Sequence, residues 1–149
     1  MQVRLLALSL SVTVLLALPT QANEKPTPEY QKAMKELGSV NNRLRNSLKD
    51  IDFPAIEKDA AAMKAIFAVV LTYWQEKKVD DAIKLAQDGV KAATELETAA
   101  KAQSHPGVVA AQAAIAGASS TGEIGAIGVC APCHTAHRVR LPDGTYEIK

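Results

Sequence analysis

The chain has 149 residues, 48% of them hydrophobic and 22% charged, with 17 basic and 16 acidic side chains. A chain of this size and composition can bury a hydrophobic core. It lacks the basic excess that is typical of proteins that bind nucleic acid or anionic membrane surfaces. We therefore expect one globular domain without a nucleic-acid partner.

The first 22 residues have the pattern of a secretory signal peptide. Arg4 precedes a mostly apolar stretch of 14 residues, 5–18, and a proline and small residues ending at Ala22 follow it. We expect cleavage after Ala22, which leaves one domain over residues 23–149 with equal numbers of basic and acidic side chains. An uncleaved membrane anchor is the alternative, but 14 residues are few for a bilayer span. We expect export, to the periplasm in a Gram-negative cell, with no stable membrane insertion after cleavage.

Both cysteines lie in one motif near the C-terminus, Cys130-Ala131-Pro132-Cys133-His134. C-x-x-C-H is the pattern at which haem c is attached. Each thiol can add across one vinyl group of the porphyrin, and the adjacent histidine can then bind the iron. We predict one covalently bound haem c, tethered by Cys130 and Cys133, with His134 as the proximal iron ligand.

Two other chemistries use paired cysteines. A thioredoxin-like redox pair has the same C-x-x-C spacing, but it typically lies in a βαβ unit near the start of a domain. Here the motif lies near the end of an alanine-rich chain with helical patterning. A structural zinc site needs four ligands, usually from two such pairs, whereas this chain has two cysteines and three histidines. Haem attachment is favoured, and these two remain as alternatives.

Apolar residues recur at three- and four-residue steps over three long segments, which is the pattern of amphipathic helices. The predicted boundaries are a first helix from about Thr27 with Pro28 at its first position, a second capped by Asp52, and a third from Asp80 or Asp81 to before His105-Pro106. A polar turn is expected over residues 75–79, between the second and third helices.

The last segment is rich in small residues and is interrupted at 117–122. We expect a fourth helix to restart near Thr121 and to carry the motif as far as Arg138. Residues 139–149 contain a turn pattern, Leu-Pro-Asp-Gly-Thr, and can form an extended tail. Four helices joined by short turns predict an all-α, antiparallel four-helix bundle, with the haem between the last helix and its neighbours.

Cys130, Cys133, His134 and Arg138 together match the C-x-x-C-H-x-x-x-[RK] ending of the class II c-type cytochromes. The chain resembles this family of four-helix proteins, which comprises the high-spin cytochromes c prime and their low-spin, methionine-ligated relatives. The resemblance implies that Arg138 lies near the haem, over its proximal face. An ordinary exposed charge at a helix C-terminus is the alternative for Arg138.

Residues 30–38 resemble the segment that supplies the sixth iron ligand in the low-spin relatives, a methionine followed by a lysine. This resemblance makes Met34 the candidate distal ligand, and the alternative is that Met34 fills the core. Met63 lies on the apolar stripe of the second helix and is expected in the core. His105, in the expected loop before Pro106, and His137, on the same helix as His134, are not expected to reach the opposite face of the ring.

Two functions follow from these assignments. The first is a single-haem electron carrier whose iron is bound by His134 and Met34 and which meets redox protein partners. The second is a five-coordinate, cytochrome c prime-like protein that binds nitric oxide or carbon monoxide, with Met34 as a wall of the distal pocket. A structural role for the haem is a third option, and the sequence leaves open whether the chain forms a homodimer. No hydrolase or nucleotide-binding pattern is present, so we expect no enzymatic activity.

Overall fold

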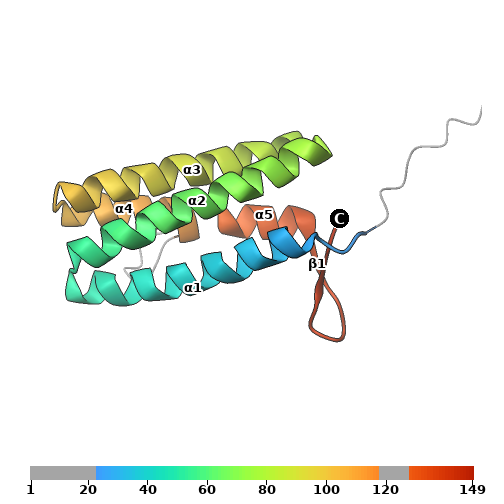
Figure 1. Ribbon diagram of the computed structural model, residues 1–149, viewed down its shortest axis with the longest axis horizontal. Coiled ribbons are helices and arrows are strands. Elements are labelled where there is room, and N and C mark those ends of the chain that lie inside the picture. Colours follow the sequence, from blue (N-terminus) through green and yellow to red (C-terminus); the bar gives the residue numbers. More distant parts are fainter. Residues whose placement is uncertain (1–22, 118–127) are drawn as a thin grey trace, which may run out of the picture.

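The computed structural model describes residues 23–117 and 128–149, which form a mostly helical protein with one small sheet (Figure 1). The elements are α1 (Pro28–Asp50), α2 (Phe53–Lys77), α3 (Asp80–Lys101), α4 (His105–Ala116), α5 (Cys130–His137), β1 (Arg138–Arg140) and β2 (Tyr146–Ile148). The prediction of a helical protein is therefore confirmed. The predicted signal peptide at residues 1–22 and the predicted helix restart at Thr121 lie outside the described residues.

Capping side chains start the first two helices where the sequence predicted them. The Oγ1 atom of Thr27 accepts a hydrogen bond from the Tyr30 amide at 3.3 Å, and a carboxylate oxygen of Asp52 accepts one from the Ala55 amide at 3.0 Å. Each cap is followed within two residues by a proline, whose fixed φ and missing N–H suit the first turn of a helix. The third helix also begins within the predicted range. The turn between α2 and α3 is shorter than predicted, because α2 continues to Lys77.

A helix that the sequence analysis missed, α4, begins at His105. Ser104 caps it, with its hydroxyl oxygen accepting a hydrogen bond from the Gly107 amide at 3.3 Å, and Pro106 lies in its first turn. The expectation of a loop at His105 was therefore wrong. The X-Pro rule correctly placed the end of the third helix, but the same proline also begins the next one.

The three long helices run in alternating directions and lie side by side (Figure 1). Helix α2 packs against both α1 and α3, and α3 packs against α4 and α5. The predicted apolar stripes are buried, and α2 contributes the most, with Trp74, Met63 and Ile56 almost completely inaccessible to solvent. Asp59 is also buried on α2, where Arg43 of α1 donates two hydrogen bonds to it, at 2.8 and 3.1 Å. A buried carboxylate needs such a partner, since an unpaired buried charge is very costly.

Helices α2 and α3 approach each other closely at Gly89. A Cβ atom added to Gly89 would lie 2.5 Å from the Cδ1 atom of Phe67, whose ring is buried in the core. Gly38 of α1 is the opposite case, because a Cβ atom there would have no neighbour within 4 Å. The two glycines therefore separate the effect of packing from the effect of helix propensity.

We expect Gly89→Ala to destabilise the protein by up to about 2 kcal/mol, because overpacking costs ~1–3 kcal/mol and the gain in helix propensity is only ~1 kcal/mol. Gly38→Ala should instead stabilise it by up to about 1 kcal/mol, since only the propensity term applies. Urea denaturation of the two variants beside the unchanged protein measures both effects. Stabilisation by Gly89→Ala would contradict the close packing of α3 on α2.

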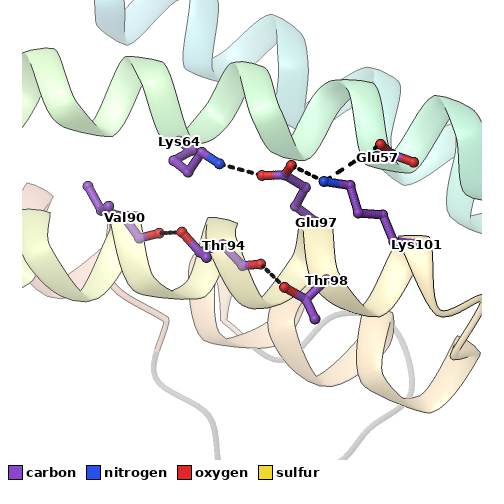
Figure 2. Close-up of polar contacts among 7 residues, drawn as sticks. All are labelled: Glu57, Lys64, Val90, Thr94, Glu97, Thr98 and Lys101. Carbon is purple, nitrogen blue, oxygen red and sulfur yellow. Dashed lines mark hydrogen bonds and ion pairs between the residues drawn. The ribbon is translucent and has the colours of Figure 1, made fainter.

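An ion-pair network joins α2 to α3, as Figure 2 shows. The carboxylate of Glu97 on α3 pairs with Lys64 of α2 and with Lys101, whose Nζ atom lies 2.6 Å from Glu97 Oε1. Lys101 also lies 3.9 Å from a carboxylate oxygen of Glu57 on α2. Hydrogen bonds from Lys101 and then from Lys64 lower the pKa of Glu97 to about 2.

We expect this network to make the fold sensitive to acid. The pKa of Glu97 is lower in the folded protein than its ordinary value of 4.5, so its ionised form stabilises the fold above pH 4.5. That contribution is lost as the pH falls towards about 2. The unfolding free energy of Glu97→Gln, measured by urea denaturation, should therefore depend less steeply on pH in this window. Glu95→Gln changes an exposed glutamate of the same helix and should keep the wild-type slope. Parallel pH profiles for Glu97→Gln and the unchanged protein would contradict the assignment.

The C-terminal residues form a β-hairpin after α5. Strands β1 and β2 are antiparallel, with Arg138 opposite Ile148 and Arg140 opposite Tyr146. The predicted turn between them is confirmed, with the Gly144 amide donating to the Leu141 carbonyl at 3.0 Å. Gly144 has a φ of +84°, a conformation that glycine adopts without strain. The tail is thus an ordered arm.

The position of Arg138 in the hairpin shows that one expectation was wrong. A pairing with Glu24 also extends the sheet to the start of the described chain. Arg138 was expected on the last helix, but its φ of −126° and ψ of 131° are those of a strand, and the helix ends at His137. On its other edge Ile148 exchanges two backbone hydrogen bonds with Glu24, at 2.8 and 2.9 Å. Glu24 also pairs with Lys77 near the end of α2. Glu24, which follows Asn23, therefore attaches the hairpin to α2.

Candidate functional site

Helix α5 carries the whole C-x-x-C-H motif on its first turns, as the sequence predicted. Its start is joined to α4, because the Val129 amide donates to the Ala114 carbonyl at 3.1 Å. Gly128, just before it, is buried against the last turn of α4. A Cβ atom there would lie 2.6 Å from the Ile115 carbonyl oxygen, so the backbone approach requires glycine. Cys130 then packs, partly buried, against the core.

A cavity of about 610 Å³ lies between α1, α5 and the hairpin. Met34 lines it from α1, Cys133 and His134 line it from α5, and Arg138 lines it from β1. The fold thus brings four of the five predicted site residues to one cavity. The fifth, Cys130, does not line it and lies one turn earlier on α5. The volume is within the roughly 300–1,000 Å³ that is usual for small-molecule and cofactor sites.

The two thiols are held in their protonated form. Burial raises the pKa of Cys130 above its ordinary value. Burial, and then the proximity of Cys130 and Asp81, raise the pKa of Cys133 to about 11. Reactive dithiols of redox enzymes show the opposite shift, towards a thiolate at neutral pH. These cysteines therefore lack the electrostatics of a thioredoxin-like pair.

His134 lies exposed at the edge of the cavity. Partial removal of water from its ring, and then the positive charge of Arg138, lower its pKa. Its imidazole is accordingly neutral at neutral pH, with a nitrogen lone pair that can bind a metal ion.

The two methionines within the described residues lie in different surroundings. Met34 is partly buried, packs against the core and lines the cavity, so its thioether has access to the same space as His134. Met63 is completely buried on α2, which confirms the prediction that it fills the core. His105 is exposed at the start of α4 and does not line the cavity.

His137 is a residue whose role the sequence analysis missed. It is the one buried residue of α5, with 8% of its surface exposed, and its ring lies against that of Trp74 with centroids 5.0 Å apart. Its Nε2 atom lies 3.1 Å from Asp81 Oδ2, close enough for an ion pair but not aligned as a hydrogen bond. Its carbonyl oxygen accepts a hydrogen bond from the Lys149 amide at 3.2 Å. His137 therefore anchors α5 to α2, α3 and the hairpin.

Tyr30 is the second missed residue, and here a signal was present. It precedes Met34 by four residues on the apolar stripe of α1, so both side chains lie on one face of the helix. Tyr30 is buried, lines the cavity and contacts Tyr73 with ring centroids 4.1 Å apart. Burial and then the proximity of Cys133 raise the pKa of its phenol, which keeps this wall of the cavity neutral.

The donor atoms around the cavity fit a haem c. A thiol and a neutral imidazole of α5 and a thioether of α1 line the cavity, and a second thiol, which does not line it, lies one turn earlier on α5. Thiols on one turn of helix can form the two thioether links, and imidazole and thioether are both established axial ligands of haem iron.

Within residues 23–117 and 128–149, no group of three or more histidine, cysteine or acidic side chains is placed to hold a metal ion. No helix in these ranges has the length and apolar character of a membrane span. Comparisons of this chain with protein-family models, with curated proteins and with solved structures found no match.

Proposed function

We propose that this protein is a monohaem c-type cytochrome that carries electrons in the periplasm and is not an enzyme. Cys130 and Cys133 would tether the porphyrin, and His134 and Met34 would bind the iron from its two sides. One observation carries the proposal: Met34 of α1 and His134 of α5, from opposite ends of the described chain, line the same cavity beside Cys133.

The chemistry of each residue suits this role. When bound, a haem c supplies one-electron exchange at its iron. The neutral imidazole of His134 is ready to act as a ligand without losing a proton. The thioether of Met34 is a soft, neutral donor, which favours the ferrous state and raises the reduction potential. The raised pKa values of Cys130 and Cys133 are unlike those of a reactive dithiol, which argues against a dithiol redox pair.

We further infer that α4 and α5 together take the place of the fourth helix in an antiparallel four-helix bundle, the fold that the class II resemblance implies. The two short helices follow one another along the helical body in Figure 1, and both contact α3. Bundles commonly place cofactors between facing helices, which matches a cavity lined by α1 and α5.

Export is part of the proposal and depends on the signal pattern of residues 1–22. Covalent attachment would make both sulfurs thioethers, so they could not pair in an oxidising compartment. We propose redox proteins as partners, which would meet the protein through a small, transient surface.

Production of the chain in a cell with haem-attachment machinery tests the proposal. The purified protein should show the added mass of one haem, resistant to denaturation, and a Soret absorption band. Cys130→Ser and Cys133→Ser should each remove one thioether link, and the double variant should lose the covalent haem. A mature protein with neither added mass nor Soret absorption would overturn the proposed function.

A further inference from the structure

The guanidinium of Arg138 is held in place by the hairpin. Its Cζ atom lies 3.9 Å from the ring centroid of Tyr146, so the guanidinium lies over the phenol ring. Both residues line the cavity. Stacking covers one face of a guanidinium and leaves its five N–H groups, which lie in the plane, available for hydrogen bonds.

No carboxylate within the described parts of the chain forms an ion pair with Arg138. Two acidic residues line the same cavity, and neither pairs with Arg138. The carboxylate of Asp143 accepts hydrogen bonds from the amide and the hydroxyl of Thr145, at 2.8 and 2.7 Å. Glu147 lies between Tyr146 and Ile148 on β2 and forms no ion pair with another described residue.

The remaining charges around the cavity are positive. Lys25, from the segment before α1, and Lys35, which follows Met34 on α1, line it together with Arg138. Among the described residues neither lysine forms an ion pair. An arginine that lies over a ring and has no carboxylate partner among the described residues, in a cavity with two more cations, is suited to bind a carboxylate group of a ligand.

Resting on the proposed function, we infer that Arg138, held by Tyr146, binds a propionate carboxylate of the porphyrin. The hairpin that ends the chain is then part of the cofactor site. This goes beyond proximity to the haem, because it assigns a bonding partner to Arg138 and a positioning role to Tyr146. A positive charge at a propionate favours the ferrous state, since it offsets the negative charge that would stabilise ferric iron.

The test compares haem-loaded variants by two measurements: the reduction potential and the propionate-bending vibration in the resonance Raman spectrum. Arg138→Gln should lower the ferrous-to-ferric ratio at a fixed potential roughly tenfold, which is about 59 mV for one electron, and should shift the vibration. Tyr146→Leu keeps the charge but removes the stacking, so it should shift the vibration and lower the ratio about threefold. Arg140→Gln removes an equal charge from the exposed end of the same strand and is the control.

The outcomes separate this inference from the function on which it rests. Absence of covalent haem in the unchanged protein overturns the proposed function. Covalent haem with equal potentials and unchanged vibrations in Arg138→Gln and Arg140→Gln overturns only the carboxylate site. A potential that responds to added acetate, with no change in the propionate vibration, would assign Arg138 to a carboxylate from solution and also overturn it. If Arg138→Gln fails to fold, Arg138→Lys keeps the charge without the planar fork and should shift the vibration at a near-normal potential.

Discussion

Replacement of Met34 by alanine is expected to remove the sixth iron ligand and to convert the haem-loaded protein from low spin to high spin. The Met34 side chain lines the same cavity as His134, and within the described residues no other methionine lines it. The methionine–iron charge-transfer band of the oxidised protein should disappear. The reduction potential should fall by roughly 0.1–0.3 V, a part of the ≈0.8 V over which axial ligands set haem potentials. Absorption spectroscopy and a redox titration measure these changes.

Met63→Leu is the matched control for this experiment. Met63 is completely buried in the core and does not line the cavity, and leucine conserves most of its volume. Its spectrum should remain that of the unchanged protein. If the unchanged protein and Met34→Ala share a high-spin spectrum, Met34 is only a cavity wall, and the five-coordinate, gas-binding function is the better assignment.

His137→Ala is expected to weaken the attachment of α5 to the helical body by about 2–3 kcal/mol. The substitution removes the one buried side chain of α5, its contact with Trp74 and its ion pair with Asp81, and leaves a cavity against α2. Opening of α5 should become roughly 30- to 150-fold more frequent, since each 1.4 kcal/mol is a factor of ten. Hydrogen exchange of the amides in residues 130–137, followed by mass spectrometry, measures this frequency.

Two variants sharpen the result. His137→Phe keeps a ring against Trp74 and removes the Nε2 atom that faces Asp81, so the difference between it and His137→Ala isolates packing from the contact with Asp81. His105→Ala removes an exposed histidine at the start of α4 and should change exchange in α5 very little. Wild-type protection of α5 in His137→Ala would contradict the anchoring role.

The helix starts could be predicted because their signals are local. Thr27-Pro28 and Asp52-Phe53-Pro54 each place a capping oxygen just before a proline, and the structure begins α1 and α2 there. Ser104-His105-Pro106 has the same pattern, and we overlooked it. The residues that follow are mostly small and show no apolar stripe at helical spacing, so the cap was the only available sign of α4.

The end of the chain was harder to predict because its structure depends on distant partners. Each strand of the hairpin has three residues, too few for a periodic pattern, and β2 is completed by backbone bonds to Glu24 at the other end of the domain. Arg138 was placed on a helix because residue spacing alone suggested a continuous face. The hydrogen bond from Lys149 to the carbonyl of His137 shows that tertiary pairing takes over from the helix at this point.

The candidate site was predictable where one motif encodes it. Cys130, Cys133 and His134 are contiguous enough for spacing to place them on one helix, and the position of Met34 on an apolar stripe put it on an inward face. The role of His137 could not be seen, because its partners Trp74 and Asp81 come from two other helices. No pattern within α5 distinguishes a buried histidine from an exposed one in a helix of eight residues.

The uneven burial of the helices bears on the order of assembly. Helix α2 buries nine residues, whereas α5 buries one, so the last segment can open while the long helices hold their packing. On the proposed function, a protein with this order of stability would expose both cysteines for haem attachment without unfolding as a whole. The tethered cofactor and the hairpin would then pack together against the long helices, which have already folded.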